Sequence, residues 1–335
     1  MLTTAYRPEI AQVGAITLGT PNLEKSLVFF RDLLGMEVTY QTEDVAYLRA
    51  YMELVHHSLI LRRSSEAIVD TYSFRVKRPE DVELFNQVLQ DKEVETLELP
   101  AGHEVGRGTA IRFIWPHAGH PIELYYDIDK PQAPEELRSK LPSNSSKRRG
   151  LGVRRIDHFN VQAKPGDMNA AEAWIRETLG FKRREFINIP EMKTIVASWM
   201  SVTPQVHDLA LVANPFEKAA QLHHVAFNLE NHSDLLVAAD VLKDHDVQFD
   251  IGPGKHGIGQ ALYLYVRDPG SGHRVELYAG GYWILDPDFE AIEWTPATVK
   301  DGLTWFGDPL EMGTDNSMAH TTNSAGLRTA NQLIG

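Results

Sequence analysis

Apolar and polar residues alternate in two distant stretches of the chain, as they do in half-buried β-strands. These stretches are residues 13–17 (VGAIT) and residues 156–161 (IDHFNV). Each is followed by a segment with the apolar spacing of an amphipathic helix, PNLEKSLVFFRDLLGMEV in one case and MNAAEAWIRETLGF in the other. Gly35 and Gly180 stand where a glycine would end these helices. The sequence therefore predicts the same strand and helix plan twice.

The two copies also close in the same way. Residues 110–127 (AIRFIWPHAGHPIELYYD) and residues 261–280 (ALYLYVRDPGSGHRVELYAG) each read as a strand, a glycine-containing turn and a second strand. Both second strands contain the pattern His-x-x-Glu-Leu-Tyr. Glu123 and Glu276 are thus equivalent positions in an internal repeat.

A strand, a helix and several further strands make a βαβββ unit, so we expect an α+β fold. The curled sheet of one unit cannot bury both faces alone, and pairing of units would leave a concave pocket. Residues 127–150 are rich in Pro, Ser and charge, as a linker is. We therefore predict an N-terminal domain over residues 1–150, a C-terminal domain over 151–290 and a partly flexible extension over 291–335.

Composition narrows the possible partners. A chain of 335 residues with 43% hydrophobic and 24% charged residues has room for two modest cores. The net charge of −13 disfavours nucleic acid, because the tight basic cluster, residues 147–149, reads better as part of a solvated linker. The sequence shows no apolar run of membrane-spanning length and begins without the apolar stretch of an export signal. We expect no membrane contact and a cytoplasmic location.

The chain contains no cysteine and 14 histidines. Disulfides, thiolate nucleophiles, iron–sulfur clusters and thiolate zinc sites are therefore excluded. Any metal must be held by imidazole and carboxylate groups.

The halves differ at positions that can carry metal chemistry. When strand is placed on strand, His158 falls opposite Ala15 and His224 falls opposite Thr71, whereas the carboxylate of Glu276 has a counterpart in the first half. Two imidazoles and one carboxylate on neighbouring strands form the facial set associated with non-haem Fe(II), which leaves coordination positions open. The sequence thus predicts a metal site in the second half alone.

Each of these residues also has a plainer interpretation. A single histidine on a strand is more often a satisfied core residue than a ligand. Glu276 could pair with Arg274 or Arg267. His223 should point to the opposite face from His224, because neighbouring residues of a strand alternate. Only the combination of His158, His224 and Glu276 favours a metal site.

Several motifs of the second half resemble those of extradiol ring-cleavage dioxygenases of the vicinal oxygen chelate superfamily, the catechol 2,3-dioxygenase type. The resemblance extends over about residues 13–294, and the residues after 305 lie outside it. The motifs are RIDHFN (155–160), VHD (206–208), LHHVAF (222–227), DIGPGKHG (250–257) and YLYVRDPGSGHRVELY (263–278). The resemblance implies paired βαβββ modules in two barrel-like domains. It implies that Fe(II), or Mn(II), which the same ligands suit, is held by His158, His224 and Glu276.

The resemblance further implies cleavage of a catechol or substituted catechol by O2 next to its two hydroxyls, with a 2-hydroxymuconic semialdehyde type of product. It places Asn160, Trp199, His256 and Tyr265 on the substrate side. His207, Tyr265 and His256 are the implied catalytic residues, with His207 as the acid/base group.

These assignments have alternatives in the sequence. His207 lies in HDLAL, which lines up with HSLIL at His57, so a histidine here can be a feature of the repeat. His256 in its glycine-rich turn could be merely solvated, and Tyr265 could simply pack. Asn160 could be an ordinary polar residue of the sheet.

Other functions suit the same fold. One is a dioxygenase for a trihydroxylated, biphenyl-type or carboxylate-bearing ring. Another is a metal-dependent lyase or isomerase like glyoxalase I, although such sites often share ligands between modules, whereas here one half holds the whole set. A third is an antibiotic-sequestering binding protein without a metal, against which the paired histidines speak. The resemblance also implies a homo-oligomer, a homotetramer.

Overall fold

The computed structural model describes residues 6–218, 220–309, 321–323 and 327. The first half contains β1 (Ile10–Thr20), α1 (Leu23–Leu27), β2 (Glu37–Gln41), β3 (Val45–Arg49) and β4 (Leu59–Arg63), then β5 (Ile68–Val76), α2 (Asp81–Asp91), β6 (Thr96–Leu99), β7 (Ala110–Ile114) and β8 (Pro121–Tyr125). These are two consecutive βαβββ units. A π-helical segment, Val28–Leu33, continues α1, and Gly35 follows with φ of 85°.

The second half repeats this order. It contains β9 (Arg155–Ala163), α3 (Met168–Leu179), β10 (Lys182–Ile189), β11 (Thr194–Ser201) and β12 (Leu209–Ala213), then β13 (Gln221–Asn228), α4 (His232–Asp244), β14 (Phe249–Lys255), β15 (Ala261–Arg267) and β16 (Arg274–Gly280). Beyond the repeat lie β17 (Ile292–Trp294), α5 (Val299–Leu303) and β18 (Thr321–Asn323). Single 3-10 turns cover Ser145–Lys147, Pro165–Asp167, Pro190–Met192 and Ile258–Gln260. Gly180 ends α3 in the left-handed conformation, as the sequence predicted.

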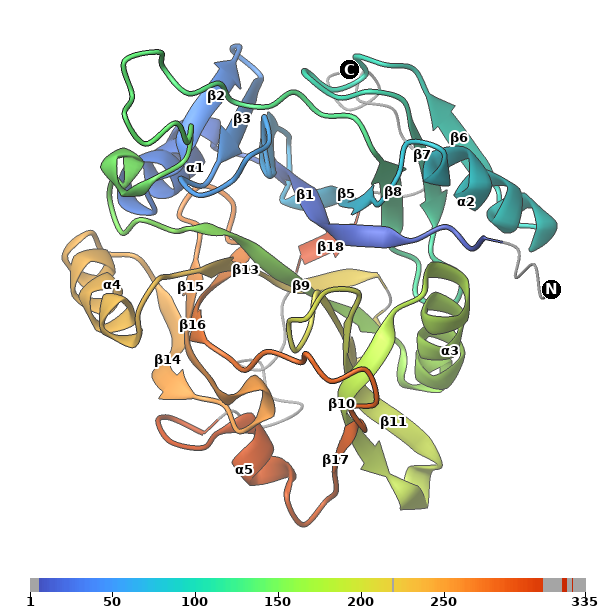
Figure 1. Ribbon diagram of the computed structural model, residues 1–335. Coiled ribbons are helices and arrows are strands. Elements are labelled where there is room, and N and C mark those ends of the chain that lie inside the picture. Colours follow the sequence, from blue (N-terminus) through green and yellow to red (C-terminus); the bar gives the residue numbers. More distant parts are fainter. Residues whose placement is uncertain (1–5, 219, 310–320, 324–326, 328–335) are drawn as a thin grey trace.

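Strand pairing is the same in both halves. In every βαβββ unit the first strand pairs in parallel with the last, as β1 does with β4 and β9 with β12. The two units of a half then join through their first strands, β1 with β5 and β9 with β13, both antiparallel. Figure 1 shows the first half in blue and teal above the second half in green to orange. The predicted α+β fold of paired βαβββ modules is confirmed.

The register supports the internal alignment residue by residue. Val13 pairs with Phe74 in the first half, as Ile156 pairs with Phe227 in the second. Ser73 pairs with Glu123, as Ala226 pairs with Glu276. Counting along β1 and β9 from these pairs places Ala15 and His158 at the same point of the two sheets.

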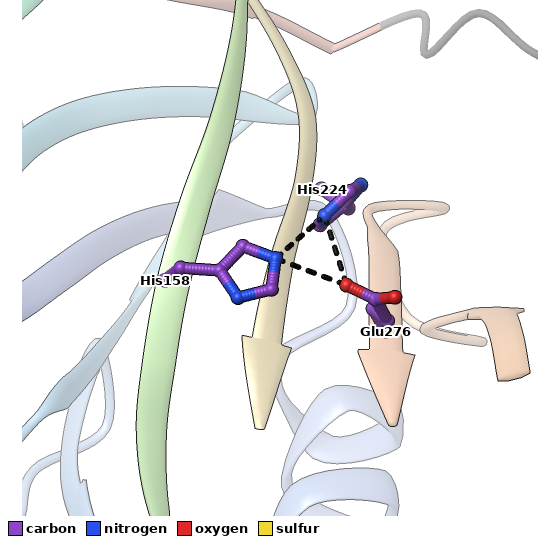
Figure 2. A group of neighbouring side chains, drawn as sticks. All are labelled: His158, His224 and Glu276. Carbon is purple, nitrogen blue, oxygen red and sulfur yellow. Dashed lines mark hydrogen bonds and ion pairs between the residues drawn. The ribbon is translucent and has the colours of Figure 1, made fainter. Parts of the chain in front are cut away.

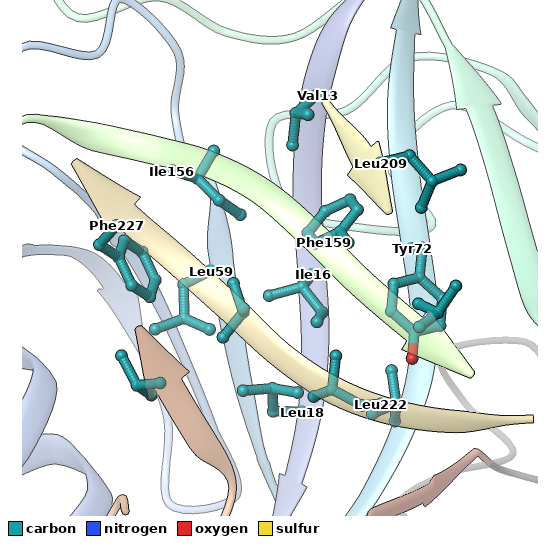
Figure 3. Close-up of a cluster of buried hydrophobic side chains, with 14 of the residues drawn as sticks. Val13, Ile16, Leu18, Leu59, Tyr72, Ile156, Phe159, Leu209, Leu222 and Phe227 are labelled. Carbon is teal, nitrogen blue, oxygen red and sulfur yellow. The ribbon is translucent and has the colours of Figure 1, made fainter. Parts of the chain in front are cut away.

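One main hydrophobic core runs through both halves. Phe159 of β9 packs edge to face on Tyr72 and Phe74 of β5, with ring centroids 5.4 and 5.6 Å apart. Figure 3 shows these strands crossing, with apolar side chains of both halves between them. Burial of such large side chains stabilises the fold by about 1.5–3 kcal/mol each. The sheets that carry the histidines are therefore fixed to the first half.

The predicted domain boundary near residue 150 lies between β8 and β9, in an irregular segment that includes the turn Ser145–Lys147. Arg148 from this segment bonds to Asp234 of α4 at 3.0 Å. Of the predicted flexible extension, residues 310–320, 324–326 and 328–335 lie outside the described residues. The described part includes β18, whose backbone pairs with both β13 and β5. None of the helices within the described ranges has the length and apolar character needed to cross a membrane.

Candidate metal centre

Three side chains converge inside the second half. His158 comes from β9, His224 from β13 and Glu276 from β16, and all three are buried. The His158 Nε2 atom lies 3.1 Å from His224 Nε2 and 3.0 Å from Glu276 Oε2, and His224 Nε2 lies 3.1 Å from the same oxygen. Figure 2 shows the three groups pointing toward one another from three strands. The structure thus brings together the residues that the sequence singled out.

The set comes from one half, but from both βαβββ units of that half. His158 belongs to the unit that starts with β9, and His224 and Glu276 belong to the unit that starts with β13. The antiparallel pair of β9 with β13 and the parallel pair of β13 with β16 bring the two units together. The pairing of units within the half therefore creates the site.

The ionisation of the cluster follows from burial and from the neighbouring charges. Burial raises the pKa of Glu276, but His224 and His158 outweigh it and hold this pKa well below its usual range. Burial lowers the pKa of His158, yet its bonds with Asp157 and Glu276 raise it to about 9. Burial also lowers the pKa of His224, to about 4. An ionised carboxylate therefore faces imidazole nitrogens across about 3 Å.

Asp157 is a buried neighbour of the cluster that the sequence interpretation missed. Its Oδ1 atom lies 2.9 Å from His158 Nδ1, the ring nitrogen that points away from Glu276. Arg155 donates to the other carboxylate oxygen at 2.8 Å. Such a carboxylate fixes the tautomer and the orientation of a metal-binding histidine. An Asp directly before the candidate ligand was the available signal.

His223 lies beside His224 rather than across the sheet. The register of β13 against β9 shifts between Leu222 and His224, and this bulge breaks the strict alternation that the sequence interpretation assumed. The two Nδ1 atoms lie 2.7 Å apart, and Arg274 Nη1 lies 3.1 Å from His223 Nε2. His224 is the member of the pair that faces Glu276.

Glu276 does not pair with Arg274 or Arg267. Both arginines bind Asp250 instead, with nitrogen to oxygen distances of 2.7 and 2.6 Å. The plainer interpretation of Glu276 as a partner of these arginines is therefore wrong. Its carboxylate remains available to the two histidines.

A cavity of about 1190 Å³, its open mouth included, lies against the three side chains. The other predicted site residues, Asn160, Trp199, His207, His256 and Tyr265, all line it. The enclosed part of this cavity, about 270 Å³, is near the lower end of the range for small-molecule sites. The predicted substrate side of the site is therefore a real concavity.

The polar groups on this wall are closely packed. The ring of His207 lies 3.9 Å from that of His158, and burial lowers its pKa well below the usual value. His256 stacks on Tyr263 at 3.9 Å, and its Nε2 atom lies 3.0 Å from the Tyr265 hydroxyl. The other ring nitrogen of His256 contacts the carbonyl oxygen of Leu303 in α5. His256 is thus held between two elements rather than freely solvated.

Asn160 and Tyr278 complete the wall. The buried Oδ1 atom of Asn160 has no hydrogen-bond partner within the described part of the chain. The ring of Tyr278, which the sequence interpretation did not select, lies 5.2 Å from that of His158. Burial raises the pKa of Tyr278 well above its usual value, so its hydroxyl stays protonated. An unpaired acceptor and the ring of a protonated tyrosine therefore border the cluster.

The sequence profile of the Glyoxalase/Bleomycin resistance protein/Dioxygenase superfamily matches residues 12–124 and 155–277. The chain belongs to this superfamily. The two matched ranges coincide with the two halves of the fold, so the superfamily unit here is a pair of βαβββ modules.

Within the superfamily, the similar proteins are dioxygenases. A manganese-dependent 2,3-dihydroxybiphenyl 1,2-dioxygenase from Geobacillus genomosp. 3 is 46% identical over 308 residues, which cover 91% of this chain and 96% of the relative. A metapyrocatechase from Geobacillus stearothermophilus is 36% identical and covers 89% of this chain and 90% of its own. The crystal structure of homoprotocatechuate 2,3-dioxygenase from Arthrobacter globiformis superposes with a TM-score of 0.84 at 28% identity, covering 97% and 95% of the two chains.

Proposed function

We propose that this protein cleaves the ring of a catechol or a substituted catechol with O2 by extradiol chemistry, giving a 2-hydroxymuconic semialdehyde type of product. The observation that carries the proposal is the buried His158, His224 and Glu276 cluster at the end of a ligand-sized cavity. The names of the similar proteins support the reaction type, and one of them favours a biphenyl-type ring as an alternative substrate.

The cluster fits a divalent metal ion. Three ligand atoms that share one face of an octahedron at about 2.1 Å from its centre lie about 3.0 Å from one another. The observed separations of 3.0, 3.1 and 3.1 Å agree with this arrangement. Two neutral imidazoles and one carboxylate suit Fe(II), and a manganese-dependent relative makes Mn(II) an equally supported choice. A bound ion of either metal would supply the electron transfer that lets O2 react with a catechol.

The other wall residues take roles that follow from their positions. His207 is proposed as the acid/base group, because its ring adjoins His158 inside the cavity. The Tyr265 hydroxyl and His256, which bond to each other, are placed to bind a catechol oxygen. Asn160, whose side-chain oxygen has no partner among the described residues, is placed to accept a hydrogen bond from a hydroxyl of the bound ring. Trp199 closes the wall beside them.

We also propose that the protein is a homotetramer and acts in the cytoplasm. Large apolar side chains at Trp283 and Leu285 are 64% and 79% exposed, which supports contacts between copies. The absence of cysteine agrees with a compartment that does not form disulfides. Light scattering after gel filtration and cell fractionation test these two points.

The test of the reaction is anaerobic loading with Fe(II) or Mn(II), followed by catechol and air. We expect oxygen uptake matched to the appearance of a yellow ring-fission product. His158→Ala and His224→Ala should abolish both signals. Absence of oxygen uptake with either metal, across unsubstituted, alkyl, phenyl and carboxymethyl catechols, would overturn the proposal and favour a lyase or a binding protein on this fold.

A further inference from the structure

One wall of the cavity is a row of apolar side chains that crosses three strands. Ile187 of β10 pairs with Ala197 of β11, which pairs with Val212 of β12. Residues opposite each other on neighbouring strands place their side chains on the same face. All three line the cavity, and they belong to a hydrophobic cluster separate from the main core. The fold therefore presents apolar surface to the ligand rather than to the protein interior.

This row lies beyond the metal-binding end of the cavity. A neighbouring row contains Trp199, Ala210 and Asn160, and Asn160 pairs with His224. Val212 lies two residues beyond Ala210 along β12, which corresponds to about 7 Å. A catechol whose hydroxyls face the three convergent side chains would therefore direct a ring substituent toward the apolar row.

Apolar groups from two further elements face the same space. Ile258 in the turn before β15 and Leu303 at the end of α5 both line the cavity. Ile189 at the end of β10 and Met192 in the turn after it lie nearer the surface on the same wall. The part of the cavity away from the metal ligands is thus enclosed by aliphatic side chains.

The described lining of this cavity contains no lysine or arginine. Glu276 is the one acidic residue among the described residues that line it. Arg274, which stands two residues before Glu276, bonds to Asp250 instead. A carboxylate that enters the apolar part of the cavity would lose its water without gaining a charged partner among the described residues there, which is costly.

The first half shows that cations are compatible with this fold at the same positions. Arg62 pairs with Val45 across β4 and β3 as Val212 pairs with Ala197 across β12 and β11, and HSLILRR aligns with HDLALVA. Arg62 binds a carboxylate, that of Glu104. Ile258 likewise stands three residues before Ala261, as Arg107 stands before Ala110. Arginine occupies both positions in one half, and an aliphatic residue occupies both in the other.

We propose that the substrate is a catechol with an apolar aryl or alkyl substituent, and that the row of Ile187, Ala197 and Val212 selects it against a carboxylate-bearing ring. This inference rests on the proposed ring cleavage and specifies the substrate class of the same site. Burial of an apolar substituent against the row favours binding of the substrate. An anionic substituent at the same place would lose its water and find no cationic side chain among the described residues.

The test uses matched catechols that carry a phenyl or a carboxymethyl group at the same ring carbon, at either of the two distinct positions. On metal-loaded wild-type protein, we expect kcat/KM for the phenyl member to exceed that for the carboxymethyl member by at least about tenfold at the position that reacts faster. A smaller ratio, or preference for the carboxymethyl ring, would overturn the inference.

A variant makes the test sharper. Val212→Arg restores the residue type of position 62, and we expect it to shift the ratio of phenyl to carboxymethyl toward the carboxymethyl ring by at least about tenfold. Leu236→Arg adds the same charge on the exposed face of α4 and should leave the ratio within about twofold. An unchanged ratio in folded Val212→Arg would contradict the role of the row. If the arginine variant does not fold, Val212→Phe serves instead. It should slow cleavage of the phenyl catechol and spare that of unsubstituted catechol, and equal effects on both would contradict the role of the row.

Failure of the proposed ring cleavage can be distinguished from failure of the proposed substrate selectivity. If unsubstituted catechol is not cleaved, the proposed function fails, and calorimetric binding of the same matched pair under nitrogen still measures the selectivity. At least about tenfold tighter binding of the phenyl member would support the apolar subsite independently of turnover. Equal or weaker binding would overturn it.

Discussion

The concave faces of the two halves contain opposite chemistry on the same scaffold. In the first half, Glu123 is buried between Arg107 and Arg112, and Arg112 Nε donates to it at 2.6 Å. In the second half, the equivalent Glu276 faces His158 and His224. Glu123 therefore has cationic neighbours, whereas Glu276 has neighbours that can bind a cation. The first half neutralises its buried carboxylate with its own arginines. In the second half the equivalent carboxylate faces two histidines, with which it can bind a metal cation.

Replacement of arginine by aliphatic residues also determines how much room each half has for a ligand. Arg62 and Arg107 of the first half occupy the positions of Val212 and Ile258, and their guanidinium groups bind Glu104 and Glu123. Aliphatic side chains at these positions are shorter and uncharged. Their presence in the second half accompanies the cavity that they line beside the three convergent side chains. Duplication therefore gave one half that stabilises by ion pairing and one half that can bind a ligand.

The largest expected difference between the halves is in activity. Glu276→Gln should lower kcat/KM for ring cleavage by a factor on the order of 10³ or more, because it removes the anionic ligand. Glu123→Gln, the matched change in the first half, should leave kcat/KM per folded molecule within about threefold. Oxygen uptake of metal-loaded proteins measures both. Similar losses in the two variants would refute the assignment of the chemistry to one half.

The change in the first half, which should barely affect activity, should markedly lower the free energy of unfolding. Glu123→Gln leaves two buried arginines without their shared carboxylate, and loss of one partner of such a network costs about 3–5 kcal/mol. Urea unfolding followed by fluorescence gives this difference in the free energy of unfolding. If Glu123→Gln unfolds at the wild-type urea concentration, the network does not stabilise the first half.

Acidification should reduce the difference in the free energy of unfolding between wild type and Glu123→Gln. Burial raises the pKa of Glu123, but Arg112, Arg107 and His103 outweigh it, so the pKa in the folded protein lies well below the ordinary 4.5. A lowered carboxyl pKa stabilises the folded state above about pH 4.5, and this contribution is lost as the pH falls toward the folded-state value. Unfolding curves from neutral pH downward should show wild type approaching Glu123→Gln only below about pH 4.5. A gap that widens on acidification would contradict this account.

A smaller effect is expected behind the metal ligands. Asp157→Asn weakens the partner of His158 Nδ1, and loss of such a partner lowers metal affinity by about 10–100-fold. Asp208→Asn is the matched control, because that buried carboxylate binds the backbone of Val202 and Thr203. Competition with a chelator measures both dissociation constants. Equal affinities in wild type and Asp157→Asn would exclude a positioning role.

The repeat in the sequence predicted much of the fold because equivalent strands carry equivalent patterns. Placing strand on strand was enough to put His158 opposite Ala15, and the shared Phe74 and Phe227 put His224 opposite Thr71. The strand register agrees with both placements. Each half, however, is itself a pair of βαβββ units. The family resemblance implied this pairing, but the residue pattern within a half did not separate the two units. Their internal similarity lies in strand pairing and is weak in residue identity, so periodicity could not reveal it.

Other parts of the site depend on contacts between distant segments. The bond of His256 with Tyr265 and its contact with Leu303 need α5 to lie beside β15. The bulge that brings His223 beside His224 is a departure from regular pairing, which an alternation rule cannot predict. The three arginines of the first half gave no signal in the sequence, because their carboxylate partners come from other strands and loops.

We propose that the second half alone holds the metal. The most direct measurement is the metal content of protein loaded anaerobically with Fe(II) or Mn(II) and then dialysed, for wild type, Glu123→Gln and the His158→Ala, His224→Ala double variant. We expect one equivalent per chain in wild type and in Glu123→Gln, and none in the double variant. Two equivalents in wild type, or one retained by the double variant, would contradict this proposal.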